Sequence, residues 1–114
     1  MAQEVHIVAT LAPKADKVDR FKDLMSQMCK DVHAKEEGST HRYILTEQLG
    51  TPEGEPKFVM VETYKDKNAA DSHTQTDHFK QLFGVMEKEG LLREGPWLAQ
   101  TVSKAGFERD RKLI

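Results

Sequence analysis

The chain has 114 residues, of which 38% are hydrophobic and 32% charged, and its formal net charge is -2. This length suits one domain with one core, and the absence of a basic excess argues against a nucleic-acid-binding protein. The single cysteine, Cys29, cannot form an internal disulfide. No apolar stretch is long enough to cross a bilayer, and the start MAQEVHIV lacks a signal-peptide pattern. We therefore expect a cytoplasmic protein without a membrane segment.

The first half of the chain predicts a strand, a helix and a second strand. Apolar residues alternate with others from Val5 to Leu11, which is the period of a pleated strand. Apolar residues at helical spacing then predict a helix over Asp16–Glu37, with Asp16 as its N-cap and Gly38 as its terminator. Alternation resumes over His41–Leu49 and predicts the second strand.

The second half predicts a strand, a broken helix and a last strand. After the turn-forming loop GTPEGEPK, a third strand is expected over Lys57–Tyr64, antiparallel to the second. The following helical region is expected to break, because Thr76 is a good N-cap. A short helix then ends near His73, and a second runs from Asp77 to about Lys88. The last strand is expected over Trp97–Ser103.

This order of elements predicts an α+β fold of the ferredoxin-like βαββαβ type, an antiparallel sheet with two helices on one face. Residues 1–103 form the single domain, and 104–114 form a charged tail. Because the other sheet face is also apolar, we expect a homodimer with sheets packed face to face. The tail is then placed to dock on the partner, or in a monomer to cover the face itself. The residues concerned are Val8, Ile44, Val59, Val61 and Val102 on the face, and Phe107, Leu113 and Ile114 in the tail.

Three runs of the sequence carry a resemblance to a known family: KADKVDRF, EEGSTHRY and FVMVETYKDKNAADSHTQTDHF. With these runs and this order of elements, the chain resembles the antibiotic biosynthesis monooxygenase family of dimeric α+β barrels. The resemblance extends to Ser103. It implies cofactor-independent oxidation of a small, largely apolar molecule, such as a quinol or anthrone, by dioxygen in a pocket between sheet and helices. In the last run the family pattern falls on Glu62, Tyr64, Ala69, Ala70, His73, His78 and Phe79.

Such a reaction needs a base that deprotonates the substrate. His78 is the first candidate, because the helix dipole in a first helical turn favours a neutral imidazole. His73, or alternatively Glu62, is expected to orient it. The expected substrate-binding residues, which supply an apolar wall with a few polar tips, are Glu62, Tyr64, Tyr43, Trp97 and Phe83.

Purely structural roles are the alternative for each of these residues. Glu62 would then form a salt bridge with Arg42 or with a helix lysine, because a buried carboxylate is costly unless paired. Tyr64 and Trp97 would be core or dimer-packing residues. His78 would be a surface or capping residue near a helix start.

Other chemistries find less support. No GxGxxG, P-loop, HExxH or CxxC pattern occurs, and in one continuous helix His73 and His78 would not share a face, so no nucleotide or metal site is expected. Haem is disfavoured, because Phe83 stands where haem-degrading relatives carry a histidine ligand. The run VETYKDKNAADSHTQTDH also looks like the autoinducer-2 phosphate isomerase. That alternative requires a phosphate clamp, for which Lys65 and Arg42 are the nearest candidates. A third possibility is a non-catalytic small-molecule-binding dimer.

Overall fold

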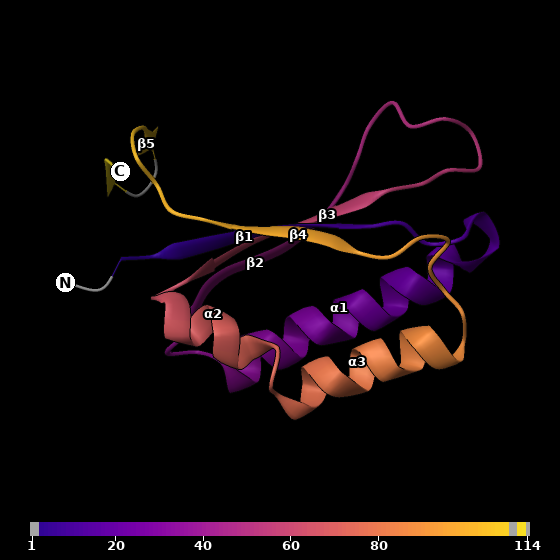
Figure 1. The fold of residues 1–114 in the computed structure, drawn as a ribbon, viewed down its shortest axis with the longest axis horizontal. Helices are drawn as coiled ribbons and strands as arrows, with labels where there is room; N and C mark the ends of the chain where they lie inside the picture. Colours follow the sequence, from indigo (N-terminus) through magenta and orange to yellow (C-terminus); the bar gives the residue numbers. More distant parts are fainter. Residues whose placement is uncertain (1–2, 110–111, 114) are drawn as a thin grey trace.

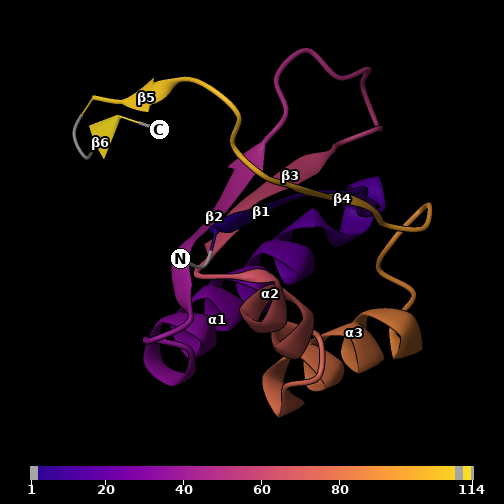
Figure 2. The ribbon, with the colours of Figure 1, turned by 60° about the vertical axis from the view of Figure 1, so that its left-hand side comes forward.

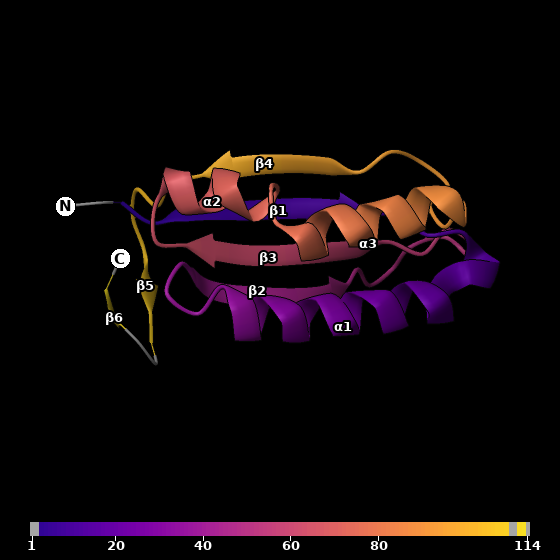
Figure 3. The ribbon, with the colours of Figure 1, turned by 90° about the horizontal axis from the view of Figure 1, so that it is seen from below.

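The computed structural model describes residues 3–109 and 112–113. Its elements are β1 (Val5–Leu11), the short 3-10 helix η1 (Ala15–Lys17), α1 (Val18–Lys35), β2 (Thr40–Glu47), β3 (Phe58–Tyr64), α2 (Lys67–His73), α3 (Asp77–Lys88), β4 (Trp97–Thr101), β5 (Phe107–Glu108) and β6 (Lys112–Leu113). The first four strands form one antiparallel sheet in the order β2-β3-β1-β4. All three α-helices cover the same face of this sheet (Figures 1 and 3). The predicted ferredoxin-like α+β fold is confirmed.

The beginning of the first helix differs from the prediction. Asp16 lies in η1, and α1 begins at Val18 without a side-chain cap. The helix also ends at Lys35, two residues earlier than expected. Glu36 leaves the helical conformation while its backbone N–H still bonds the Val32 carbonyl at 2.9 Å. This early end frees Glu36 to turn inward.

The predicted break in the second helical region is confirmed. The Thr76 hydroxyl accepts a hydrogen bond from the Phe79 N–H, which makes Thr76 the N-cap of α3. Strands β2 and β4 each end two residues before the predicted end. Beyond β2, Leu49 is 91% exposed and Gly50 adopts a positive φ of 75°. The chain therefore turns away from the sheet there, since a positive φ is a turn conformation that favours glycine.

The hydrophobic core lies between the sheet and the helices. Alternate residues of β1 and β3 face the helices, as the two-residue period requires. Residues on one stripe of α1 and of α3 pack against them. The members of this core include Phe21, Met25, Met28, Phe58, Met60, Leu82 and Met86.

The opposite sheet face carries exposed apolar side chains. Ile44 and Trp97 are 46% and 60% exposed, and the sheet register places both on this face, with Ile44 opposite Val61 and Trp97 opposite Thr10. The register does not place Val102 there, contrary to expectation, because Val102 follows the end of β4 at Thr101. The β5–β6 hairpin and the 48–57 loop both rise on this side of the sheet, toward opposite ends (Figures 1 and 2). The hairpin is tied to β2 by an ion pair between Arg42 and Glu108 at 3.0 Å. It leaves Ile44 and Trp97 exposed, so the described part of the tail does not cover this face.

Two further expectations concern the tail and membranes. Phe107 is 57% exposed, whereas Ile114 and the side chain of Leu113 lie outside the part that can be described. Among the described residues, no helix is long and apolar enough to cross a membrane.

Candidate active site

The break between α2 and α3 brings two histidines together. His73 is the last residue of α2, and His78 lies in the first turn of α3. The Thr76 hydroxyl donates to the His73 carbonyl at 2.7 Å and accepts from the Phe79 N–H at 3.3 Å, so this one side chain holds both helix ends. Because the two helices have different axes, a five-residue spacing no longer separates the imidazoles. The predicted break therefore allows both histidines to reach one site, which their spacing in one continuous helix would have prevented.

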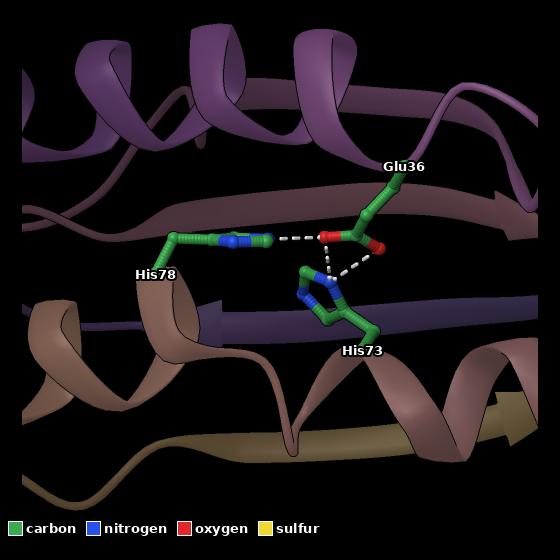
Figure 4. A group of neighbouring side chains, drawn as sticks. All are labelled: Glu36, His73 and His78. Atoms are coloured by element: carbon green, nitrogen blue, oxygen red, sulfur yellow. Dashed lines mark hydrogen bonds and ion pairs between the residues drawn. The ribbon is translucent and has the colours of Figure 1, made fainter.

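Both imidazoles converge on the carboxylate of Glu36 (Figure 4). His73 Nδ1 lies 3.0 and 2.9 Å from the two carboxylate oxygens, and His78 Nε2 lies 2.5 Å from Oε2. The Thr40 hydroxyl donates to Oε1 at 2.9 Å. Glu36, His73 and His78 are all buried. We call these three residues the Glu36 cluster.

Glu36 was not identified as a site residue from the sequence, although a signal was present. The buried residues of α1 include Met25, Met28 and Val32, and the next position on that stripe is 36. A carboxylate at a buried position needs partners. The run EEG, which includes Glu36, also belongs to the stretch that resembles the family.

The charge of Glu36 determines which ring nitrogens carry hydrogen. Burial acts to raise the pKa of this carboxyl, but the hydrogen bonds from His73, His78 and Thr40 outweigh it, and the pKa lies below its ordinary value. An ionised carboxylate only accepts hydrogen bonds, so His73 Nδ1 and His78 Nε2 both donate. In a neutral His73, the nitrogen that can accept a proton is then Nε2.

His73 also lies on the wall of a cavity between the sheet and the helices. The cavity has a volume of about 60 Å³. Its polar lining residues are Tyr43, Glu62, His73 and Thr74, and its apolar lining residues are Ile7, Ala9, Leu11, Met25, Met60, Phe79, Phe83, Pro96, Trp97 and Leu98. The rings of Tyr43, Tyr64 and Phe79 pack around the His73 imidazole at centroid distances of 5.3 to 5.4 Å. These contacts leave the ring little freedom to rotate.

Among the described residues, the second ring nitrogen of His73, Nε2, has no hydrogen-bond partner, whereas Nδ1 is bonded to Glu36. In the described part of the chain, every buried side-chain nitrogen or oxygen has a hydrogen-bond partner. No partner is found there for Nε2, so this atom retains accessible surface. His78, by contrast, lines a groove of about 180 Å³ between α1 and α3, together with Gln27, Asp31 and Gln81. His78 is not among the residues that line the inner cavity, although its ring centroid lies 6.4 Å from that of His73.

Glu62 is buried in the cavity wall, where it is hydrogen-bonded to a tyrosine. The Tyr64 hydroxyl donates to Glu62 Oε1 at 2.5 Å. The alternative of a salt bridge with Arg42 was wrong, because Arg42 is opposite Thr63 in the sheet register and pairs with Glu108 on the other face. Burial raises the pKa of the Glu62 carboxyl.

The other expected site residues fall into two groups. Tyr43 and Phe83 line the cavity as expected. Tyr64 is completely buried and supports Glu62 from behind, so it is not part of the cavity wall. Trp97 lies at the cavity edge with 60% of its surface exposed, because β4 is an edge strand.

The donor atoms of the Glu36 cluster lie within 4.8 Å of one another, which is close enough to consider a metal ion. They are, however, already joined by direct hydrogen bonds of 2.5 to 3.0 Å. Metal-binding histidines usually donate their second ring N–H to a carboxylate or carbonyl. Neither histidine has such a partner among the described residues. The geometry fits a hydrogen-bonded base and its supports better than a metal centre, and Phe83 has no atom that could bind haem iron.

Comparisons with known proteins agree with this architecture. A conserved protein from Methanosarcina mazei Go1 is 27% identical with a TM-score of 0.76, over 90% of this chain and 94% of its own. A Caulobacter crescentus CB15 protein, provisionally described as an antibiotic biosynthesis monooxygenase, is 25% identical with a TM-score of 0.78, over 90% and 92%. Comparison with curated proteins gives no significant match. The family described as antibiotic biosynthesis monooxygenase matches residues 4–84, more than half of the chain, and the chain belongs to this family.

Proposed function

We propose that this protein is a cofactor-independent monooxygenase, which uses dioxygen to oxidise a small, largely apolar molecule with an acidic C–H or O–H group. The observation that carries the proposal is His73. Its Nδ1 is held by the buried carboxylate of Glu36 at 2.9 Å, and its Nε2 is the nitrogen available to the cavity. A base whose second nitrogen is fixed by a carboxylate is the usual arrangement for removing a proton near neutral pH.

In the proposed reaction, His73 Nε2 takes a proton from the substrate. The resulting imidazolium is stabilised by the Glu36 carboxylate, which lies in a buried site where charge interactions are weakly screened. The substrate anion is then electron-rich enough to reduce dioxygen. Ten of the fourteen cavity-lining residues are apolar, and such a lining disfavours water at the reacting atoms.

His78 supports the base from behind in this scheme. It donates to Glu36 Oε2 at 2.5 Å and holds the carboxylate in the position that His73 requires. We therefore assign the role of base to His73 and a positioning role to His78, which reverses the order expected from the helix dipole alone.

The size of the cavity limits how a substrate binds. Sites for small molecules usually have volumes of about 300 to 1,000 Å³, and this one has about 60 Å³. A second hollow of about 490 Å³ lies next to it and shares Phe83 and Pro96 as lining residues. We propose that the reacting end of the substrate enters the inner cavity. Its apolar remainder lies in the outer hollow against Met86 and Leu92.

The isomerase alternative finds no phosphate clamp at this cavity. Among the described residues, those that line it include neither lysine nor arginine. Arg42 is engaged with Glu108, and Lys65 is exposed after the end of β3. Arg93 lines the outer hollow, but its Nη1 donates to the Pro13 and Pro56 carbonyls at 3.3 and 2.6 Å. A small phosphorylated dione would therefore bring its charge into an uncompensated apolar space, which is costly.

Oxygen uptake with anthrone and a set of dihydroquinones tests the proposal, with parallel anaerobic incubations. We expect turnover that requires oxygen, and a loss of about 10²- to 10⁴-fold in His73→Ala, because general base catalysis contributes about that much. His33→Ala, which removes an exposed imidazole, is the matched control and should retain activity. Turnover without oxygen would favour an isomerase, and binding without turnover would favour a non-catalytic binder.

We also propose that the protein forms a homodimer through its open sheet face. Ile44 and Trp97 are exposed there, and the β5–β6 hairpin and the 48–57 loop flank the face as two raised edges. A large exposed apolar patch is unusual on a soluble monomer. Light scattering should give a dimer mass for the wild type and a monomer mass for Ile44→Lys. A monomeric wild type at micromolar concentration would refute this arrangement.

A further inference from the structure

The cavity contains a second ionisable group that the role of His73 leaves unused. Glu62 is 5% exposed and lines the cavity together with His73. Among the described residues it has no lysine, arginine or histidine partner in an ion pair, and its one hydrogen bond comes from the Tyr64 hydroxyl. A buried carboxylate without a cation is costly to ionise.

The hydrogen bond from Tyr64 determines which oxygen can carry a proton. Tyr64 donates to Oε1, so Oε1 acts as the carbonyl-like acceptor. Every buried polar side-chain atom of the described residues has a hydrogen-bond partner, whereas Oε2 of Glu62 has no such partner. Oε2 therefore has accessible surface, and a proton on Oε2 would be available to a molecule in the cavity.

The surrounding charges agree with a protonated Glu62. Burial is the main cause that raises the pKa of this carboxyl, and the negative charge of Glu36 acts in the same direction. The hydrogen bond from Tyr64 and the charge of His73 act in the opposite direction without cancelling the rise. Two further ionisable neighbours, Tyr43 and Cys29, have pKa values that burial raises above their ordinary values.

We propose that Glu62 is a second catalytic residue, a general acid that delivers the proton on Oε2 to the reduced oxygen bound in the cavity. This assignment rests on the proposed oxygenase function and names the residue that completes it. His73 removes a proton, but an oxygenation that ends in water also needs a proton donor and a second deprotonation. Among the described residues that line the cavity, Glu62 is the other group that can supply both.

For a substrate R₂CH₂ the steps balance as follows. His73 takes one C–H proton, and the carbanion transfers electrons to dioxygen and forms a C–O bond, which gives R₂CH–O–O⁻. Glu62 protonates the outer oxygen. Its carboxylate then removes the remaining C–H proton while the O–O bond breaks, and the departing hydroxide takes the proton from His73. The products are R₂C=O and H₂O, and both residues return to their starting states.

The Glu62→Gln variant separates this role from that of His73. Glutamine has nearly the same shape and can accept the Tyr64 hydrogen bond, but it cannot serve as the acid. With anthrone as the probe, we expect anthrone and oxygen consumption within a few-fold of the wild type. Anthraquinone formation should fall by at least about 10²-fold, while anthrone hydroperoxide accumulates. Glu37→Gln, at an exposed position, is the matched control and should behave as the wild type.

Infrared spectroscopy at pH 7 gives a readout that does not depend on activity. We expect a protonated-carboxyl band in the wild type that is missing in Glu62→Gln. An absent band in the wild type, or anthraquinone formation at the wild-type rate in Glu62→Gln, overturns the assignment. Loss of anthrone consumption in His73→Ala with normal product in Glu62→Gln would overturn only the role of Glu62. A wild type that consumes no oxygen with any probe would overturn the oxygenase proposal itself.

Discussion

Removal of the Glu36 carboxylate should destabilise the fold as well as the site. Glu36→Ala would leave the N–H groups of His73 and His78 buried without their acceptor, and the Thr40 hydroxyl would lose its partner. A buried donor without an acceptor destabilises the folded state by its full desolvation free energy. The variant also leaves a cavity where the carboxylate was.

The expected loss can be worked out from these contacts. Removing one partner of a buried charged network costs about 3 to 5 kcal/mol. A domain of this size has a total stability of about 5 to 15 kcal/mol. At about 4 °C per kcal/mol, the melting temperature should fall by about 12 to 20 °C. A large part of the free energy of unfolding therefore depends on the Glu36 side chain.

Urea unfolding and thermal melting measure this effect. Glu36→Gln should lower the free energy of unfolding by less than Glu36→Ala does, because glutamine keeps the side-chain volume and one acceptor oxygen. One of the histidines can also change its tautomer and accept a hydrogen bond from the amide NH₂. Glu37→Ala removes the exposed neighbouring carboxylate and should change stability by less than about 0.5 kcal/mol. If Glu36→Ala were no more destabilising than Glu37→Ala, the cluster would not stabilise the protein and the reasoning would be wrong.

Two further predictions concern acid stability and α3. The pKa of Glu36 is lowered in the folded state, so the contribution of its ionised carboxylate to stability is fully present above the ordinary value of 4.5. This contribution is lost as the pH falls through the lower folded value. The urea midpoint of the wild type should therefore drop in that pH range, and the midpoint of Glu36→Gln should drop less. Gly84 lies within α3 with open space around an added Cβ, so Gly84→Ala should raise the free energy of unfolding by about 1 kcal/mol and raise the melting temperature. Gly90 has a φ of +60°, so Gly90→Ala should lower the free energy of unfolding by about 1 kcal/mol and lower the melting temperature. Melting-temperature shifts of the same sign in the two glycine variants would contradict the second expectation. An acid-induced loss of stability in Glu36→Gln as large as in the wild type would contradict the first.

The elements of the fold follow from local patterns in the sequence. The alternation over Phe58–Tyr64 depends only on neighbouring residues, because successive side chains of a strand point to opposite faces. The break between His73 and Asp77 was equally predictable, because a threonine N-cap acts within its own helical turn. The order of these elements restricts the topology to very few arrangements.

The site itself was decided by tertiary packing. Glu36 meets His73 and His78 across 37 and 42 residues of sequence. The hydrophobic periodicity of a single helix gives no information on how the end of α1 packs against the start of α3. For the same reason the sequence could not tell which histidine faces the cavity, or that Arg42 is separated from Glu62 by the sheet. Local chemistry determines the direction of a side chain along its own element, whereas packing between elements determines which side chains meet.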